Sequence, residues 1–502
     1  MSPKTTQRRL HGFSRQQVKE SLYHDRQLTG DRLRGQTGRP SDTSETYNIN
    51  KSLKCLSNYG CQGEQLGVIL WGLLGPETLA SERRTRTLGL GATVRSFNDL
   101  AVPGLGGVWF GKELLLATLG VAIAERLRDG GKRAQNIEVT NAIEALACWL
   151  AYKSMRSTKP EPRLRGSLKM SGKEDLSFAT VRKRTFYVTQ PMRQATVQPL
   201  RALGLVESTG ERFNAFRCTK NGEAFMDAAW TALRPHKRSV LDHLVLWAKG
   251  DHDDVKTSPE LRKALSPIEP MSESAREFLR ELLVQGSSNE ASRRCKALDW
   301  VDSLRDKPQQ RVKWDAKPAI MDALHWRDLR AGALFFAARD SAIALLDQIE
   351  SNIGCAANLV MSMDAPLPED VVAKVRTLRQ HARTFLDDNY DPSRDRQATK
   401  FCLECTEGVD VRVLEMLLSR EGHVLKQRGR DILPGVAFRG KQVDVIAARS
   451  SEDDGAEAET AQLIRLPEGI SHRVRNLFLL NLDLCNELGN WLAGPGVNNG
   501  GA

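Results

Sequence analysis

The chain has 502 residues, of which 40% are hydrophobic and 27% charged, and 73 Lys and Arg against 62 Asp and Glu give a formal net charge of +11. Single cores stop growing at roughly 250 to 300 residues, so this length predicts three or four domains. The composition excludes collagen-like, wholly disordered and membrane-embedded proteins. The longest apolar stretch, Leu114 to Ala124, is far shorter than the roughly 20 residues that a bilayer crossing needs. We therefore expect a cytoplasmic protein with no membrane partner, and the excess of positive charge favours a polyanionic partner.

The first half of the chain predicts an arm followed by a helical domain. Residues 1–50 contain nine Lys and Arg against five Asp and Glu and few large apolar side chains, which is typical of a basic flexible arm. Apolar residues then recur at helical spacing through a predicted helical domain at 51–157, with helices at 114–127 and 137–152. A basic, proline-containing loop is expected at 154–172.

A helix-turn-helix pattern followed by a hairpin is predicted at 173–235. Thr189 and Thr196 stand where they could cap two successive helices, and Gly204 stands where the second should end. The runs 205–207 and 213–218 then alternate like a two-stranded hairpin, and Thr219 can cap a closing amphipathic helix.

This stretch resembles the winged helix-turn-helix family, through Leu200-Arg-Ala-Leu-Gly-Leu-Val-Glu207 and Thr219-Lys-Asn-Gly222. The resemblance covers about 178–233 and implies DNA binding, with one helix in the major groove and the hairpin near the phosphates. The side chains that it makes candidates for DNA contact are Arg182, Lys183, Arg184, Arg193, Gln194, Gln198, Arg201, Arg212 and Arg217. Winged helices also serve as protein-docking modules, so both uses stay open.

The second half predicts another helical domain and a small mixed unit. Amphipathic segments at 240–249, 272–284, 290–304, 320–349 and 371–386 predict a helical domain at 236–395. Short β-like runs at 422–432, 436–448 and 462–466 lie between two helices and predict a small α/β domain at 396–495, before a Gly/Asn tail at 496–502. The fold class expected is thus mainly α and multidomain.

Three motifs could carry other chemistry. Gly106 to Lys112 fits the start of a phosphate-binding loop, G-x-x-x-x-G-K, but Glu113 stands in place of the Ser or Thr that binds magnesium. Glu415 and Asp444 look like the first acids of a PD-(D/E)xK nuclease core, whose E-x-K element is missing from Ala461 to Leu466. Cys402 and Cys405 form a single CxxC, which is two ligands short of a structural zinc site.

We therefore expect a DNA-binding, non-enzymatic subunit of a larger prokaryotic assembly, of the mobile-element or antiviral-defence type. Its partners would be duplex DNA and other protein subunits, and it would need no cofactor and no metal. Two alternatives remain open. One is a protein scaffold that docks through the winged helix, and the other is a metal-dependent nuclease, active or degenerate, whose sequence departs from the PD-(D/E)xK motif.

Overall fold

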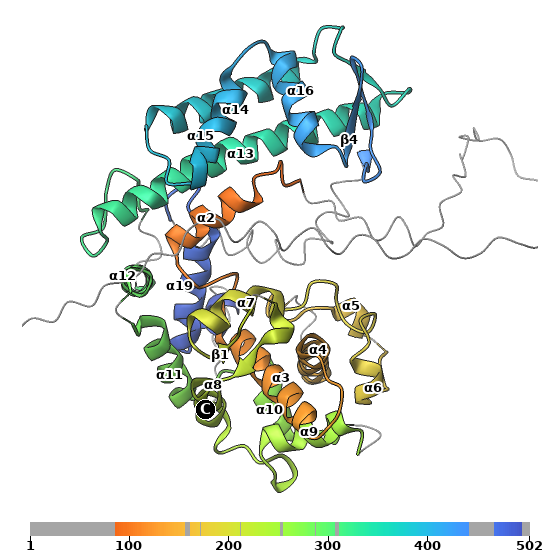
Figure 1. The fold of residues 1–502 in the computed structure, drawn as a ribbon, viewed down its shortest axis with the longest axis vertical. Helices are drawn as coiled ribbons and strands as arrows, with labels where there is room; N and C mark the ends of the chain where they lie inside the picture. Colours follow the sequence, from red (N-terminus) through yellow and green to blue (C-terminus); the bar gives the residue numbers. More distant parts are fainter. Residues whose placement is uncertain are drawn as a thin grey trace, which may run out of the picture. The chain divides into compact units, whose positions relative to one another are not determined.

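The computed structural model of the chain describes residues 86–155, 161–170, 172–210, 212–251, 255–286, 288–306, 311–440 and 466–493. The chain divides into two units, Met1–Leu73 and Leu74–Ala502, and every described residue belongs to the second. Most described residues are helical, which confirms the mainly α prediction (Figure 1). The predicted arm at 1–50 and tail at 496–502 lie outside the described residues.

A first group of elements runs from α2 to α12, and α19 and α20 near the C-terminus pack with it. The elements are α2 (Gly91–Ala101), α3 (Gly111–Asp129), α4 (Asn136–Ser154), α5 (Ser167–Met170), α6 (Phe178–Val181), α7 (Arg193–Ala202), β1 (Val206–Glu207), η1 (Phe213–Ala215), β2 (Arg217–Cys218), α8 (Lys220–Trp230), η2 (Pro235–Lys237), α9 (Val240–Lys249), α10 (Pro259–Leu265), α11 (Glu273–Val284), α12 (Asn289–Arg305), α19 (His472–Leu484) and α20 (Leu488–Ala493).

Helix α3 is the centre of the first hydrophobic core. It contacts α4, α7, α8, α9 and β2, and almost all of its residues up to Ala124 are buried. This explains why its apolar stretch has no polar face, since a helix that is covered on every side does not need one. Gly120 brings α4 close, because a Cβ at that position would lie 2.6 Å from the Cα of Thr140.

Side-chain caps mark the starts of several helices in this half, of which α9, α11 and α12 start within one residue of the predicted position and α10 was not predicted. The hydroxyls of Ser239, Ser258, Ser272 and Ser288 accept hydrogen bonds from backbone N–H groups three residues later, at the starts of α9, α10, α11 and α12. Thr219 caps α8 in the same way, as predicted. These caps satisfy donors that the first turn of a helix leaves free.

The segment before the hairpin differs from the prediction. A single helix, α7, replaces the two predicted helices, and Thr196 does not cap it but lies inside it, where its hydroxyl donates to the carbonyl of Arg193. The end is as predicted: Gly204 has φ +67°, and the N–H of Leu205 donates to the carbonyl of Leu200. This pair of features is a Schellman motif, which favours glycine because of the left-handed conformation.

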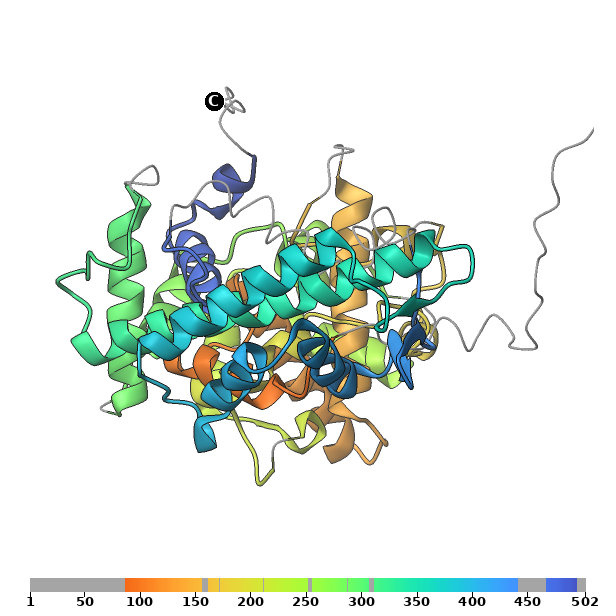
Figure 2. The ribbon, with the colours of Figure 1, turned by 90° about the horizontal axis from the view of Figure 1, so that it is seen from above.

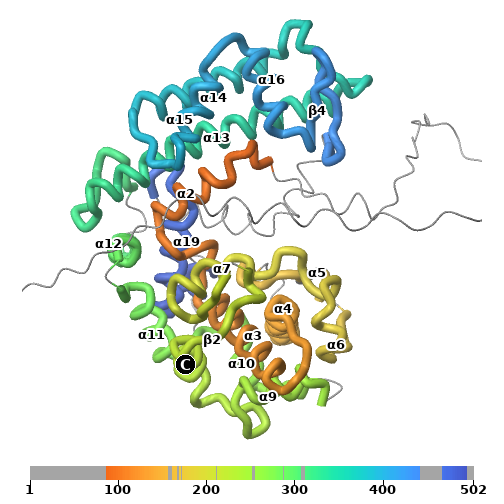
Figure 3. The backbone as a smooth tube through the Cα atoms, viewed as in Figure 1, coloured from red at the N-terminus to blue at the C-terminus, as the bar shows by residue number. Residues whose placement is uncertain are grey.

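The predicted hairpin is present but short. β1 and β2 pair antiparallel through Val206 with Cys218 and Glu207 with Arg217. Residues 213–215, predicted as strand, form the 3-10 turn η1 instead, and Figure 3 traces the turn of the backbone from α7 through β2 into α8. The winged-helix identity of the whole segment stays a prediction.

The second hydrophobic core forms around α13 and includes Phe97 of α2. Helix α13 contacts α14, which in turn contacts α15 (Figure 2). A three-stranded antiparallel sheet in the order β3, β5, β4 completes this group. Its elements are α13 (Ala323–Cys355), β3 (Met361–Ser362), α14 (Glu369–Asp387), η3 (Arg394–Arg396), α15 (Gln397–Thr406), α16 (Asp410–Glu421), β4 (Leu425–Arg428) and β5 (Asp431–Pro434).

The two cores draw on segments from several of the predicted domains. Helix α19 contacts α11, α12, α2 and α3, so its buried apolar residues belong to the first core although they follow the elements of the second. The β-like run predicted at 436–448 forms no strand as far as Gly440, the last described residue before the gap at 441–465. The predicted multidomain division itself stays a prediction. Among the described residues, no helix is long and apolar enough to cross a bilayer.

Candidate nucleic-acid interface

The candidate DNA-binding segments contact the N-terminal half of α4. Arg193, the first residue of α7, donates from its Nε to Oδ1 of Asn141 at 2.6 Å. Its guanidinium also lies over the ring of Phe213, 5.7 Å from the centroid. Arg193 is half-buried there, and burial lowers the pKa of its guanidinium although Glu144 acts in the opposite direction.

Two further contacts bring the other segments to the same place. Arg182 forms an ion pair with Glu138 of α4 at 3.7 Å and lies over the ring of Phe178. Asn136, at the start of α4, donates from Nδ2 to the carbonyls of Phe213 and Phe216 at 2.9 and 2.8 Å. The segment around 182, the start of α7 and the hairpin therefore converge on the first turns of α4.

The hairpin is also tied to α3 and α4 by hydrogen bonds to its backbone and side chains. The N–H of Cys218 donates to the carboxylate of Glu125 on α3 at 2.9 Å. Oδ1 of Asn214 accepts from the N–H of Ile137 at 3.0 Å, so it satisfies a free donor in the first turn of α4. The hairpin is consequently held in one position relative to α7.

Five of the candidate basic residues remain exposed and available, and we call them the basic surface. None of these five side chains forms a hydrogen bond or an ion pair with another described residue, although one lysine acts electrostatically on Asp175. They are Lys183, Arg184, Arg201, Arg212 and Arg217. An exposed cation without a protein partner can neutralise a phosphate without first breaking an ion pair.

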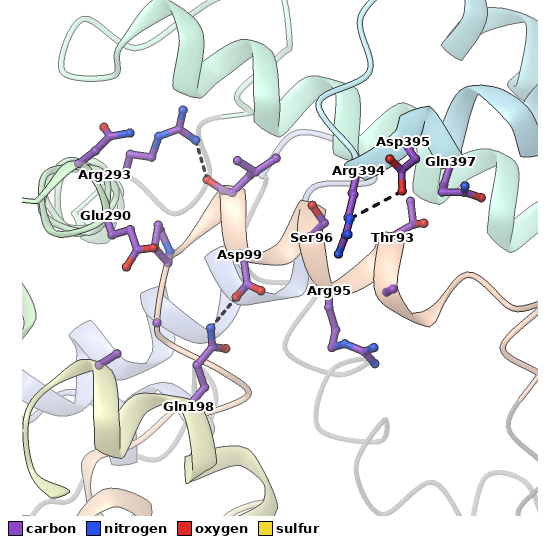
Figure 4. Close-up of a pocket in the computed structure, with 16 residues that line it drawn as sticks. Thr93, Arg95, Ser96, Asp99, Gln198, Glu290, Arg293, Arg394, Asp395 and Gln397 are labelled. Atoms are coloured by element: carbon purple, nitrogen blue, oxygen red, sulfur yellow. Dashed lines mark hydrogen bonds and ion pairs between the residues drawn. The ribbon is translucent and has the colours of Figure 1, made fainter. Parts of the chain in front are cut away.

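Part of the outward face of α7 is covered. Gln198 donates from Nε2 to Oδ1 of Asp99 on α2 at 2.7 Å (Figure 4). Asp99 also pairs with Arg473. The N–H of Gly107 donates to the carbonyl of Ala195, and a Cβ at Gly106 would lie 2.6 Å from that same oxygen. The predicted role of Gln198 at a base edge would therefore require this contact with α2 to break. Gln194 is exposed and donates to the carbonyl of Thr189.

A half-open cavity of about 880 Å³ adjoins this face. Figure 4 shows polar side chains from α2, α7, α12 and η3 around it, with Arg394 directed toward Asp395. Asp395 and Arg396 both have positive φ, which is unusual for residues other than glycine. The charges of the lining are largely paired, since Arg293 pairs with Asp328 and Asp99 with Arg473. The cavity therefore does not select a polyanion by charge.

The structure does not favour nucleotide binding at Gly106 to Lys112. The carboxylate of Asp483 accepts from the N–H of Gly111 at 2.8 Å, so a protein side chain occupies the helix N-terminus where a phosphate would bind. Lys112 is buried and donates to the carbonyls of Lys263 and Ala264. Burial lowers the pKa of Lys112 to about 8, with Asp483 acting against this shift. In the connection before α3, Gly104 and Gly106 have positive φ, a conformation that favours glycine.

The described residues do not form a nuclease site. Glu415 lies on α16 and forms an ion pair with Arg430 at 2.7 Å, while Arg430 also pairs with Asp364. Asp444 lies outside the described residues. Glu421, close to Glu415, is used structurally, because its two oxygens accept from the N–H groups of Val424 and Leu425.

The CxxC pair lies in the second core. Cys402 and Cys405 are fully buried on α15, and burial raises the pKa of Cys405 to about 12 and that of Cys402 further still. Within the described ranges, no group of three or more His, Cys, Asp or Glu side chains is arranged to hold a metal ion. These thiols are therefore packed as small apolar groups in the part of the chain that the structure shows.

Sequence reasoning missed the polar residues of α4. Asn141 and Glu144 lie inside the helix predicted at 137–152 and Asn136 lies just before it, and all three position the hairpin or α7. In the sequence, the only signal is that polar residues interrupt an apolar helix. Ordinary surface positions of a helix give the same signal, so it does not identify these residues.

Comparisons of the chain with models of protein families, with curated proteins and with solved structures found no match.

Proposed function

We propose that the chain binds duplex DNA through the basic surface and acts as a non-enzymatic subunit of a larger assembly. One observation carries this proposal: five exposed basic side chains, none hydrogen-bonded or ion-paired to a described residue, lie on segments that converge on the start of α4. Cations of this kind contribute sequence-independent affinity by releasing counterions from the phosphates.

The order of the elements supports the same proposal. In winged helices, the helix before the hairpin enters the major groove, and here that helix is α7. Its supporting helices are α3 and α4, which precede the resembling segment, because α7 and β2 contact α3 and the turn η1 contacts α4.

The test is a gel-shift titration of duplex DNA at about 50 and 200 mM salt. Five phosphate contacts should reduce the affinity on the order of a hundredfold or more between these concentrations. Replacing Arg212 and Arg217 together by Ala should weaken binding to all sequences alike and flatten the log–log salt slope by about two units.

A matched control removes the same charge elsewhere. Arg376 and Arg383 are exposed on α14, so the double variant R376A/R383A should keep the slope of the parent. If the parent binds no DNA at the lower salt, or if both double variants lose the same affinity, the basic surface is not a DNA-binding site.

A second candidate function is protein docking, which the coverage of α7 favours. Gln198 is held by Asp99, and the loop around Gly106 packs on Ala195 and Pro199, so less of α7 is free than a deep major-groove contact needs. A pull-down with and without nuclease treatment distinguishes the two. A partner that survives nuclease treatment and is lost from R212A/R217A would establish docking.

A further inference from the structure

A buried carboxylate lies under the first turn of α7. Glu144 of α4 is completely inaccessible to solvent, and its Oε1 accepts a hydrogen bond from the backbone N–H of Arg193 at 2.6 Å. Its other oxygen, Oε2, is buried without a hydrogen-bond partner among the described residues. An anion at a helix N-terminus is favourable, but an incompletely bonded carboxylate in the interior is costly.

Few charges face this carboxylate. Arg165, from the loop before α5, acts on Glu144 and also lies 4.0 Å from Glu113 of α3, so its charge is shared between two buried acids. Arg193 of α7 is the other cation, and it is attached one turn away on α4, at Asn141. The remaining titratable neighbours are Cys148 and Tyr187, whose Sγ and hydroxyl lie 3.4 Å apart.

The charge of Glu144 changes within the neutral range. Burial raises its pKa to about 7 from an ordinary 4.5, although Arg165, the N–H groups of Arg193 and Met192 and the charge of Arg193 act in the opposite direction. Below this pKa the carboxyl is neutral and needs no compensating cation. Above it, a buried charge must be balanced by a nearby guanidinium.

We propose that Glu144 is a positioning residue that retains Arg193 against α4 when it is ionised and releases Arg193 to contact a DNA phosphate when it is protonated. This role of Glu144 rests on the proposed function. It makes the positive charge that the start of α7 offers to DNA depend on pH. Because binding and protonation are linked, DNA that engages Arg193 should also promote proton uptake by Glu144.

The experiment measures the salt slope of duplex-DNA binding at pH 6 and pH 8.5 for the full chain and its variants. The parent should lose about one unit of slope at pH 8.5, equivalent to one phosphate contact. Glu144→Gln, which is permanently neutral and can still accept from the N–H of Arg193, should keep the steep slope at both pH values. Arg193→Ala should show the shallow slope at both.

Glu138→Gln is the matched control. Glu138 lies on the same helix but is half-exposed and pairs with Arg182, so this variant should retain the pH difference of the parent. Because the chain contains nine histidines, only the difference between the parent and Glu144→Gln counts.

The stability of the free protein provides a readout that does not need DNA. A folded-state pKa raised above the unfolded value stabilises the protein at low pH, and this contribution is lost as pH rises through about 4.5 to 7. Glu144→Gln should therefore melt at a higher temperature than the parent at pH 8, with little difference at pH 4, where Glu144 is protonated in the folded state and largely protonated in the unfolded state.

The outcomes separate the two proposals. If the parent binds DNA with the same slope at both pH values, or if Glu144→Gln keeps the pH difference, the role of Glu144 is wrong and the proposed function stands. If no variant binds DNA at either pH, both are wrong, and a melting difference at pH 8 would then show that Glu144 acts on stability alone.

Discussion

Asn136 connects the start of α4 to the hairpin. Its amide donates to the carbonyls of Phe213 and Phe216, and its Oδ1 accepts from Arg128. The residue is completely buried, so neither carbonyl can find water in its place. This buried side chain thus helps to fix where the hairpin, and with it Arg212 and Arg217, lies, together with the contacts of Cys218 with Glu125 and of Asn214 with Ile137.

The variant Asn136→Ala should lower the free energy of unfolding by roughly 2 kcal/mol or more, because it leaves two buried acceptors unsatisfied. Urea denaturation of the purified chain measures this loss. Asn214→Ala is the comparison: Asn214 is exposed and bonds one N–H at the start of α4, so its loss should cost about 1 kcal/mol or less. Equal losses in the two variants would contradict the role assigned to Asn136.

Arg193 and Gln198 show the limit of predicting a DNA-binding site from residue type alone. Both are candidates for DNA contact, and in this structure both contact protein, at Asn141 and Asp99. Arg201, Arg212 and Arg217 are exposed, as the expected contact requires. The helical position of a side chain follows from the sequence, whereas a partner contributed by a distant helix does not.

The contact between α3 and α4 depends on Gly120. A Cβ at this position would lie 2.2 Å from Oγ1 of Thr140 and 2.6 Å from its Cα. The second of these atoms belongs to the backbone, so a rotamer change cannot relieve the overlap, and the helices would have to move apart.

The variant Gly120→Ala should therefore destabilise the protein by about 3 kcal/mol, at the upper end of the range for overpacked cores. Thermal unfolding detects the change. Gly130→Ala is a suitable control on the same connection, because its Cβ would meet no atom closer than 3.4 Å. A Gly120→Ala protein as stable as the parent would show that the two helices are not held at this distance.

Local hydrogen bonds explain why the start and end positions of several helices could be predicted from the sequence. A serine cap, or the glycine of a Schellman motif, acts on groups within about five positions along the chain. The bounds of α9 and α11 were accordingly predicted correctly, and so was the end of α7 at Gly204. The start of α7 was predicted wrongly because Thr196 had the residue type of a cap, whereas the N–H of Arg193 at that helix start donates to Glu144, from α4.

At the scale of the whole molecule, we expect the purified chain to cut no DNA when Mg²⁺ or Mn²⁺ is supplied. A PD-(D/E)xK site needs an acid and a lysine on the strand after Asp444, and the sequence offers Gln462 and Arg465 there. Plasmid nicking followed by gel electrophoresis measures the activity. Nicking that disappears in Asp444→Ala would establish the nuclease alternative instead, and nicking that persists in that variant would indicate a contaminant.

The sequence by itself determined the mainly helical class, the bounds of α9, α11 and α12 to within one residue, and the exposure of several basic side chains. All of these follow from interactions between near neighbours or from the spacing of apolar residues. Only the tertiary structure decided that Asp483 occupies the N-terminus of α3, although it lies 372 positions later in the chain. It likewise decided that α19 completes the first core and that Glu144 lies beneath Arg193. Whether a side chain is buried depends on segments that are distant in the sequence and that exclude water from it only once the chain has folded.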